Sequence, residues 1–331
     1  MNSPLSPQMF PATLRATAAA LLSFTALSGH AETIFGMTTD SSFSPAPGLA
    51  LVRFDSATPG SVTTIGSFSG VVAGQALRSI DFWPATVELY AVSTSGTTAN
   101  FSQVQLYTVN LTTAALTPVG AGLTLTGNTN VRVGMDFNPV VDRIRIVTGG
   151  VTGNSFRANP ITGAMVTVDI DLAYAAGDTL AGNPPRILAA AYSNNAAGAT
   201  STTLYAYDYS FDNLATVGGV GGTPSPHLGQ LFTVGTPPAG FLTFNGAIGM
   251  DISGATGVLY MTHDDPVSGT PMSPYTVSTA TGAQTVVGAY GGGLFIGDIS
   301  VQIAAAPEPA THLTALLGLA GLLGWRRIQR V

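Results

Sequence analysis

The sequence predicts an all-β domain, a β-propeller-like repeat of about five blades, and three observations predict it. Runs that alternate apolar and polar residues, rich in Val, Thr, Tyr and Leu, recur through residues 32–303 and are separated by short polar turns. No segment of this range keeps the 3.6-residue period of an amphipathic helix. The runs also group into units of about 40 to 50 residues with about four strands each, which is typical of propeller blades.

The strand pairs are predicted by a motif of an aromatic strand, a polar turn and a β-branched strand. It reads LVRFDSATPGSVTTIG, LYTVNLTTAALTPVG, FRANPITGAMVTVD, LYAYDYSFDNLATVG and YTVSTATGAQTVVG. The turns carry Asp55, Asn110, Asn159, Asp208 and Ser278, whose side-chain oxygens accept backbone hydrogen bonds. Gly163 and Gly282 are expected at positive φ. The long step before Ser278 contains GGVGGTPSPHLGQLFTVG, which predicts at least one additional strand.

A second motif predicts how the ring closes. It reads SIDF, GMDF, GMDI and GDIS, and it places four aspartates at one repeat position: Asp81, Asp136, Asp251 and Asp298. The last strand, Leu294–Val301, lacks the rest of its repeat, while the first repeat lacks this opening strand. Pairing the two, near Thr33–Thr38, would remove the exposed strand edges. A β-sandwich or an open array is the alternative.

Recurrence of the four aspartates at one phase favours a structural role, in which they accept backbone hydrogen bonds at blade corners. The functional alternative is a ring of carboxylates around a central channel.

The N-terminus predicts export. Arg15 is the single charged side chain before an apolar run at 16–27, and Gly29 and Ala31 are the small residues of a signal-peptidase site. Residues 1–31 are therefore interpreted as a signal peptide, cleaved after Ala31.

Residues 304–331 predict a sorting tail. Pro307, Glu308 and Pro309 precede an apolar run that ends before Arg326 and Arg327. The run would form a short transmembrane helix of roughly 23 Å, against about 30 Å for a bilayer core. This order of features resembles the PEP-CTERM sorting signal. The resemblance implies recognition by an exosortase, brief anchoring of the C-terminus in the membrane and a place at the cell surface, and it suggests a polysaccharide partner.

Composition excludes several chemistries. The chain has no lysine and no cysteine, and between the two end segments seven arginines face sixteen acids, a formal net charge of −9. Without a basic patch we expect no nucleic-acid partner. Schiff-base, thiol and disulfide chemistry lack their residues. His227 and His263 are the two histidines between the end segments, too few for a multi-histidine zinc site.

A further resemblance rests on VGMDFNPVVDRIRIVTG, ANPITGAMVTVDIDLAYAAGD and AAYSNNAAGATSTTLYAYD, which are similar to the DUF4394 family of bacterial secreted proteins. It covers residues 80–240 most densely and trails to Val301. The resemblance supports the repeat fold and implies no catalytic residue.

Two clusters are candidate sites. Asp169, Asp171 and Asp178 supply carboxylate oxygens of the kind calcium prefers, although surface aspartates near a turn are common and the spacing is not that of an EF-hand. The segment 263–265, His-Asp-Asp, could act as a base or ligand, or be a solvated loop.

These features predict an exported, surface-sorted protein that binds a ligand or has a structural role in the cell envelope or the extracellular polysaccharide matrix. No cofactor is expected apart from the calcium ion considered above. The alternative is a calcium- or carboxylate-dependent hydrolase on a propeller.

Overall fold

The computed structural model describes residues 31–39, 49–95, 103–124, 133–149, 154–235, 248–265 and 270–303. The predicted signal peptide, except Ala31, and the predicted sorting tail lie outside these residues. Among the residues described, no helix is long and apolar enough to cross a membrane.

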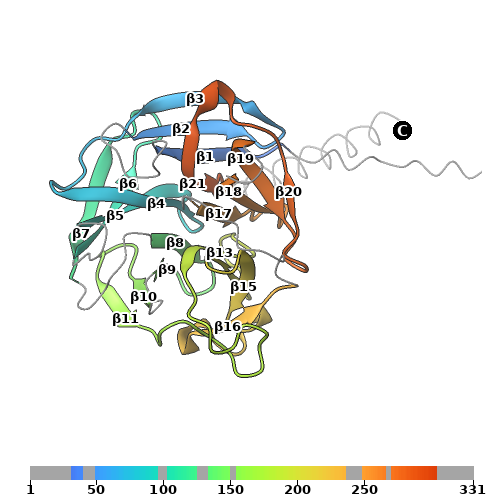
Figure 1. The fold of residues 1–331 in the computed structure, drawn as a ribbon. Helices are drawn as coiled ribbons and strands as arrows, with labels where there is room; N and C mark the ends of the chain where they lie inside the picture. The colour runs from blue at the N-terminus through green and yellow to red at the C-terminus, as the bar shows by residue number, and fades with distance from the viewer. Residues whose placement is uncertain are drawn as a thin grey trace, which may run out of the picture. The chain divides into compact units, whose positions relative to one another are not determined.

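The described residues form five sheets, the blades of a ring (Figure 1). From blade 1 to blade 5 the innermost strands are β21 (Phe295–Val301), β4 (Gln75–Trp83), β8 (Val133–Asn138), β13 (Ile187–Tyr192) and β17 (Ile248–Ile252). The second strands are β1 (Thr33–Thr39), β5 (Glu88–Ser95), β9 (Arg143–Thr148), β14 (Leu204–Asp208) and β18 (Leu259–Asp265). Each innermost strand contacts the innermost strand of the next blade.

The outer half of each blade is built from shorter or more exposed strands. The third strands are β2 (Ala50–Asp55), β6 (Gln103–Val109), β10 (Ser155–Ala158), β15 (Asn213–Val217) and β19 (Thr270–Val277). The fourth strands are β3 (Thr58–Ser67), β7 (Leu116–Thr124), β11 (Met165–Val168), β16 (Gln230–Thr233) and β20 (Gln284–Val286). Short 3-10 turns are η1 (Val220–Gly222), η2 (Pro226–Leu228) and η3 (Gly291–Gly293).

The predicted ring closure is confirmed. The C-terminal strand β21 pairs antiparallel with β1, from Ile34 opposite Val301 to Thr39 opposite Phe295. Blade 1 is therefore made from both ends of the domain, and closure removes the two strand edges that an open array would expose.

The turn chemistry predicted from the sequence is also confirmed. The side-chain oxygens of Asp55, Asn110, Asn159, Asp208 and Ser278 each accept a hydrogen bond from a backbone N–H two or three residues further on. Gly163 and Gly282 have φ of 68° and 71°, the left-handed region that glycine adopts at little cost.

Blade 4 departs from the regular pattern. Its aromatic motif forms β14 and β15, the second and third strands, whereas in the other blades the motif forms the third and fourth. The insertion after Val217 supplies the missing strand, β16, as predicted. A short strand β12 (Ala173–Tyr174) then pairs parallel with β16 as a fifth strand. The long spacing before Ser278 therefore arises because the aromatic motif of blade 4 lies one strand nearer the inner strand than in the other blades.

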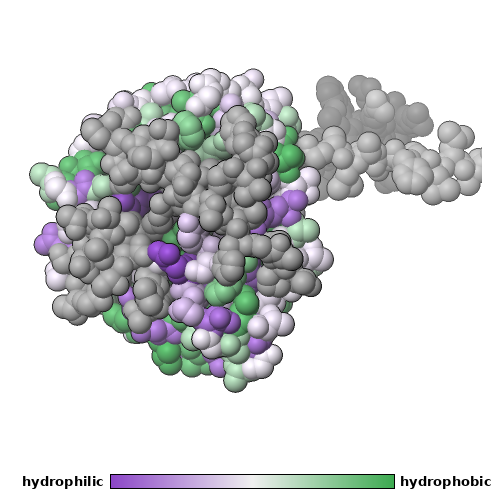
Figure 2. Space-filling model, viewed as in Figure 1, coloured by the Kyte–Doolittle hydropathy of each residue, from purple (hydrophilic) through white to green (hydrophobic). Residues whose placement is uncertain are grey.

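The cores lie between the blades. Buried apolar side chains form five clusters. Between blades 1 and 2, Phe35 meets Phe82 edge to face at 5.4 Å between ring centroids. Burial of one such side chain contributes about 1.5–3 kcal/mol. Figure 2 shows hydrophobic surface at the rim near β11, where Val166 and Val168 are exposed.

Candidate functional site

Three carboxylates from different blades converge on the inner strands. Asp81 lies on β4, Asp136 on β8 and Asp251 on β17, and one oxygen of each lies within 4.8 Å of the others. Each residue is only 1% exposed. We call these three residues, with the Ser300 hydroxyl that bridges two of them, the inner carboxylate cluster.

The fourth recurring aspartate does not occupy the same level, which corrects the prediction. Ser300 of β21 occupies the position that the aspartates have on the other strands. Its hydroxyl accepts from the Phe82 N–H of the next blade at 3.1 Å, as Asp81 accepts from the Phe137 N–H. Asp298 lies two residues earlier on the same face, and its Oδ2 accepts from the Ile80 N–H at 2.7 Å.

The close packing of neighbouring inner strands determines which of their residues lie at the same level. A Cβ on Gly249 would lie 2.4 Å from the Asp298 Cα, so Gly249, not Asp251, is level with Asp298.

Asp81 and Asp251 hold neighbouring blades together, as the structural interpretation predicts. Asp81 Oδ2 accepts from the Phe137 N–H of the next blade at 2.9 Å. Asp251 Oδ2 accepts from the Val301 N–H at 2.7 Å. The Ser300 hydroxyl contacts both carboxylates, Asp81 Oδ1 at 2.9 Å and Asp251 Oδ2 at 3.1 Å. The structural interpretation is therefore confirmed for Asp81 and Asp251. Three of the four recurring carboxylates also converge, while a channel lined by them stays a prediction.

Asp136 is different. Both of its oxygens are buried and have no hydrogen-bond partner among the described residues. Blade 4 offers no matching acid. Gly134 packs against Ala189, so the position level with Asp136 on β13 is Ala191.

Burial raises the pKa of every inner aspartate. For Asp81 and Asp136 the pKa rises well above its usual range, through loss of hydration first and then through repulsion from the neighbouring carboxylates. The Tyr192 N–H opposes the rise at Asp136 without outweighing it. Burial raises the pKa of Asp251 to about 6 and that of Asp298 to about 7.

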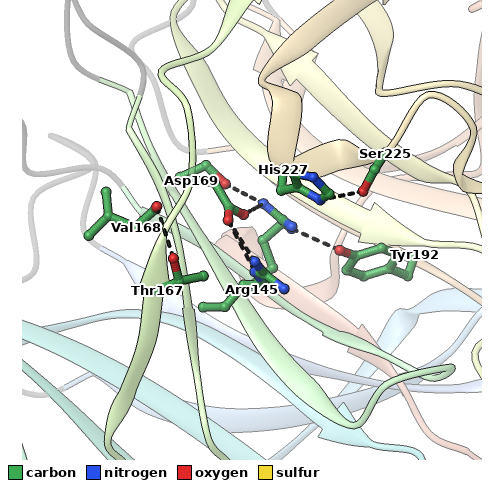
Figure 3. Close-up of polar contacts among 9 residues, drawn as sticks. Arg145, Thr167, Val168, Asp169, Tyr192, Ser225 and His227 are labelled. Atoms are coloured by element: carbon green, nitrogen blue, oxygen red, sulfur yellow. Dashed lines mark hydrogen bonds and ion pairs between the residues drawn. The ribbon is translucent and has the colours of Figure 1, made fainter.

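The predicted calcium ligands lie elsewhere and have other partners. Asp169 follows β11 and forms an ion pair with Arg145 at 2.6 Å and another with Arg157 at 2.9 Å. Arg145 also donates to the Tyr192 hydroxyl at 2.8 Å, and Figure 3 shows this network beside the Ser225–His227 pair.

The other two members of the predicted set bind separate groups. Asp171 accepts from Asn154 Nδ2 at 2.8 Å. Asp178 accepts from the Thr233 N–H at 2.7 Å and from the Thr233 hydroxyl at 2.8 Å. Within the described chain, the group of three or more acids that converges is the inner carboxylate cluster. Calcium at Asp169, Asp171 and Asp178 stays a prediction.

The two histidines are held by local contacts. His263 on β18 is 3% exposed, lies 2.8 Å from Gln284 Oε1 through Nε2 and stacks on Tyr275 at 4.1 Å between centroids. The side chains of residues 264 and 265, its predicted partners, lie outside the described set. His227 Nδ1 lies 2.6 Å from the Ser225 hydroxyl in an exposed turn.

A surface cavity is present at one end of blade 2. Its volume is about 320 Å³, and it is open to solvent. The polar groups that line it are Glu88, Thr108, Asn110 and Thr117, with Val87 and Leu111 among the apolar ones. Sequence reasoning missed this cavity, because its residues come from turns of two different hairpins.

Fold and centre together define a five-bladed β-propeller with buried carboxylates on its inner strands. The chain belongs to the family described as a domain of unknown function, DUF4394, which matches residues 50–300. Residues 305–328 match the PEP-CTERM protein-sorting motif. The motif supports an exported, cell-surface protein and implies processing by an exosortase. No curated protein matches the chain.

Solved structures similar to this chain include two that are described as a putative or known enzyme. A putative 6-phosphogluconolactonase from Bacteroides uniformis is 13% identical, with a TM-score of 0.42 over 78% of this chain and 82% of that one. A GH43_1 enzyme from Xanthomonas citri in complex with xylotriose is 14% identical, with a TM-score of 0.48 over 77% of this chain and 86% of that one. Similarity at this level concerns the fold alone.

Proposed function

We propose that this protein is a binding component of the cell surface and that its partner is a neutral polysaccharide. The observation that carries the proposal is the burial of the inner acids. Asp81, Asp136 and Asp251 are 1% exposed and Asp298 is 6% exposed, so a sugar in solution does not reach them. A glycoside hydrolase needs two carboxyl groups on either side of a bound glycosidic bond. Binding is therefore favoured over the hydrolase alternative.

The cavity on blade 2 is the proposed ligand site. Its volume of about 320 Å³ is at the lower end for small-ligand pockets. Hydroxyl, amide and carboxylate groups beside apolar side chains suit a sugar ring, which has hydroxyls at its edge and C–H groups on its faces. The net charge of −9 between the end segments favours a neutral polysaccharide over an anionic one.

The test is affinity electrophoresis of the exported protein in gels that contain neutral or anionic polysaccharides. We expect retardation by a neutral polymer and at least a tenfold weaker effect for Thr117→Trp, whose indole would fill the cavity. Thr64→Trp on β3 is the matched control, because Thr64 is also exposed on an outer strand. Equal retardation of both variants would remove the cavity from the proposal. Release of reducing sugar by the wild type would favour the hydrolase.

We also propose that both end segments are removed before the protein reaches its final location. Ala31 is exposed and Glu32 is buried, with its backbone N–H donating to the Ser56 hydroxyl at 2.9 Å. This position suits Glu32 as the first residue of the folded domain. Intact-mass analysis of the surface form tests both cuts. A mass that includes residues 313–331 would mean that the tail is a permanent anchor.

A further inference from the structure

The inner carboxylate cluster has fewer donors than its contacts require. Ser300 has one hydroxyl proton, yet its oxygen lies 2.9 Å from Asp81 Oδ1 and 3.1 Å from Asp251 Oδ2. Its oxygen already accepts from the Phe82 N–H. One proton serves one of the two carboxylates, so the other contact lacks a hydrogen unless a carboxyl group is itself protonated.

Among the described residues, no donor reaches Asp136 with hydrogen-bond geometry, and the Tyr192 N–H that lowers its pKa does not offset its burial. Its two oxygens offer about four acceptor positions, and both oxygens are buried without a partner. A buried carboxylate in this condition is strongly unfavourable, and native proteins satisfy such groups with a partner, a water molecule or an ion. Because Asp136 is 1% exposed and one of its oxygens lies within 4.8 Å of those of Asp81 and Asp251, it is oriented into the cluster.

The protein does not direct its own nearby cation to the cluster. Arg145 is opposite Asp136 in the β8–β9 register. Its guanidinium instead donates to the Tyr192 hydroxyl, the Ser155 hydroxyl and Asp169. The remaining ionisable groups that act on the cluster are Asp298 and Glu32, and both are acids.

We propose that the inner carboxylate cluster is a divalent-cation site, with Asp81, Asp136, Asp251 and the Ser300 hydroxyl as its ligands and Ca²⁺ as the ion. Hard oxygen ligands are those that Ca²⁺ selects. Its bonds of about 2.3–2.6 Å place ligand oxygens up to about 5 Å apart, which suits a cluster whose oxygens lie within 4.8 Å. Mg²⁺ usually keeps several of its water ligands, and carboxylates that are only 1% exposed leave little room for them.

An ion at this position would act on the whole ring. The three acids belong to blades 2, 3 and 5, and Ser300 belongs to blade 1. One cation would therefore connect four of the five blades at their inner strands. The proposal does not depend on the polysaccharide proposal, since the cavity of blade 2 shares no residue with the cluster.

The test uses the full-length chain purified in detergent and freed of metal on a chelating resin. We expect about one Ca²⁺ per chain to rebind. At a Ca²⁺ concentration about 100 times Kd, the melting temperature should rise by about 5–10 °C. The rise should be larger at pH 8 than at pH 5, because protons compete for the same carboxylates. Mg²⁺ should give a smaller rise.

Asp136→Asn is the decisive variant, since it removes one ligand charge and keeps the shape of the side chain. We expect it to lose most of the Ca²⁺-induced rise. Asp298→Asn is the matched control, a buried inner-strand aspartate at the neighbouring level, and it should keep the rise. If Asp136→Asn does not fold, Asp171→Asn at the exposed alternative site decides: the Ca²⁺-induced rise should be kept in this variant, and its loss would place the ion there.

Two results would overturn the proposal. An equal Ca²⁺-induced rise in the wild type and in Asp136→Asn would place the ion elsewhere, with Asp169, Asp171 and Asp178 as the next candidates. A wild type that neither retains nor responds to Ca²⁺ would mean that the cluster is balanced by protons alone.

Discussion

Asp169 and Asp136 are both buried carboxylates, the first just after β11 and the second on β8 of the same blade, yet their charges are balanced in opposite ways. Asp169 pairs with Arg145 and Arg157. Asp136 has no partner among the described residues and faces two further acids. The Arg145–Asp169 pair joins residues 24 apart in sequence. The Ser300–Asp81 contact joins residues 219 apart.

The difference shows that blade formation and ring closure have different electrostatic requirements. The buried Asp169 is tolerated because Arg145 and Arg157 of the same blade supply its countercharge. The inner cluster exists only when the ring closes, and closure brings like charges together. Its balance must come from protons or from an ion.

The largest effect is expected from deleting residues 294–331. The deletion removes β21, and with it Ser300, Asp298 and the pairing with β1. We expect no cooperative thermal transition, because the first and last blades would both lose their inner-strand contacts. Circular dichroism and a thermal melt measure this, with a deletion of residues 307–331 as control. A melt like that of the control would mean that closure contributes little.

The next largest effect is expected from Arg145→Met. It leaves the buried Asp169 with one partner and should cost about 3–5 kcal/mol, which lowers the melting temperature by about 10 °C. Arg145→Met combined with Asp169→Leu should recover most of the loss, because no charge then stays buried at that position. A double variant as unstable as the single one would show that the guanidinium stabilises mainly by packing.

The pH dependence of the melting temperature should report on the buried aspartates of the inner strands. Folded pKa values of about 7 for Asp298 and about 6 for Asp251 lie above the unfolded value of about 3.9. The folded state therefore binds more protons than the unfolded state, and its stability falls as pH rises. In calcium-free buffer we expect the melting temperature to fall by several degrees between pH 5 and pH 8.

Asp298→Asn should flatten the upper part of this curve, because it removes the group whose pKa is about 7. A melting temperature that rises steadily from pH 5 to pH 8 without calcium would contradict the raised pKa values.

The smallest effect is expected from Arg157→Gln. The side chain of Arg157 is 28% exposed, so its ion pair with Asp169 is partly screened by solvent. We expect a loss of about 1 kcal/mol or less, measured by urea unfolding. A loss as large as that of Arg145→Met would mean that the two arginines act as one unit.

Much of the fold was predictable because its signals are local. The polar turns at Asn110 and Asn159 and the alternating strands beside them are specified by residues within a few positions of one another. Blade 4 was harder to recognise. Its inner strand places Ala191 where the others carry Asp or Ser, so the repeated motif is absent there.

The sequence by itself determined an all-β repeat that closes as a ring, a family and a sorting tail, because strand periodicity, turn residues and terminal motifs are read from neighbouring positions. Only the tertiary structure decided that Ser300, and not Asp298, stands level with the aspartates. It also decided that Asp81, Asp136 and Asp251 meet while Arg145 turns to Asp169. The physical reason is that the relative height of inner strands depends on close packing between blades. Contacts such as Gly249 against Asp298 set that height, and they join residues far apart in the chain.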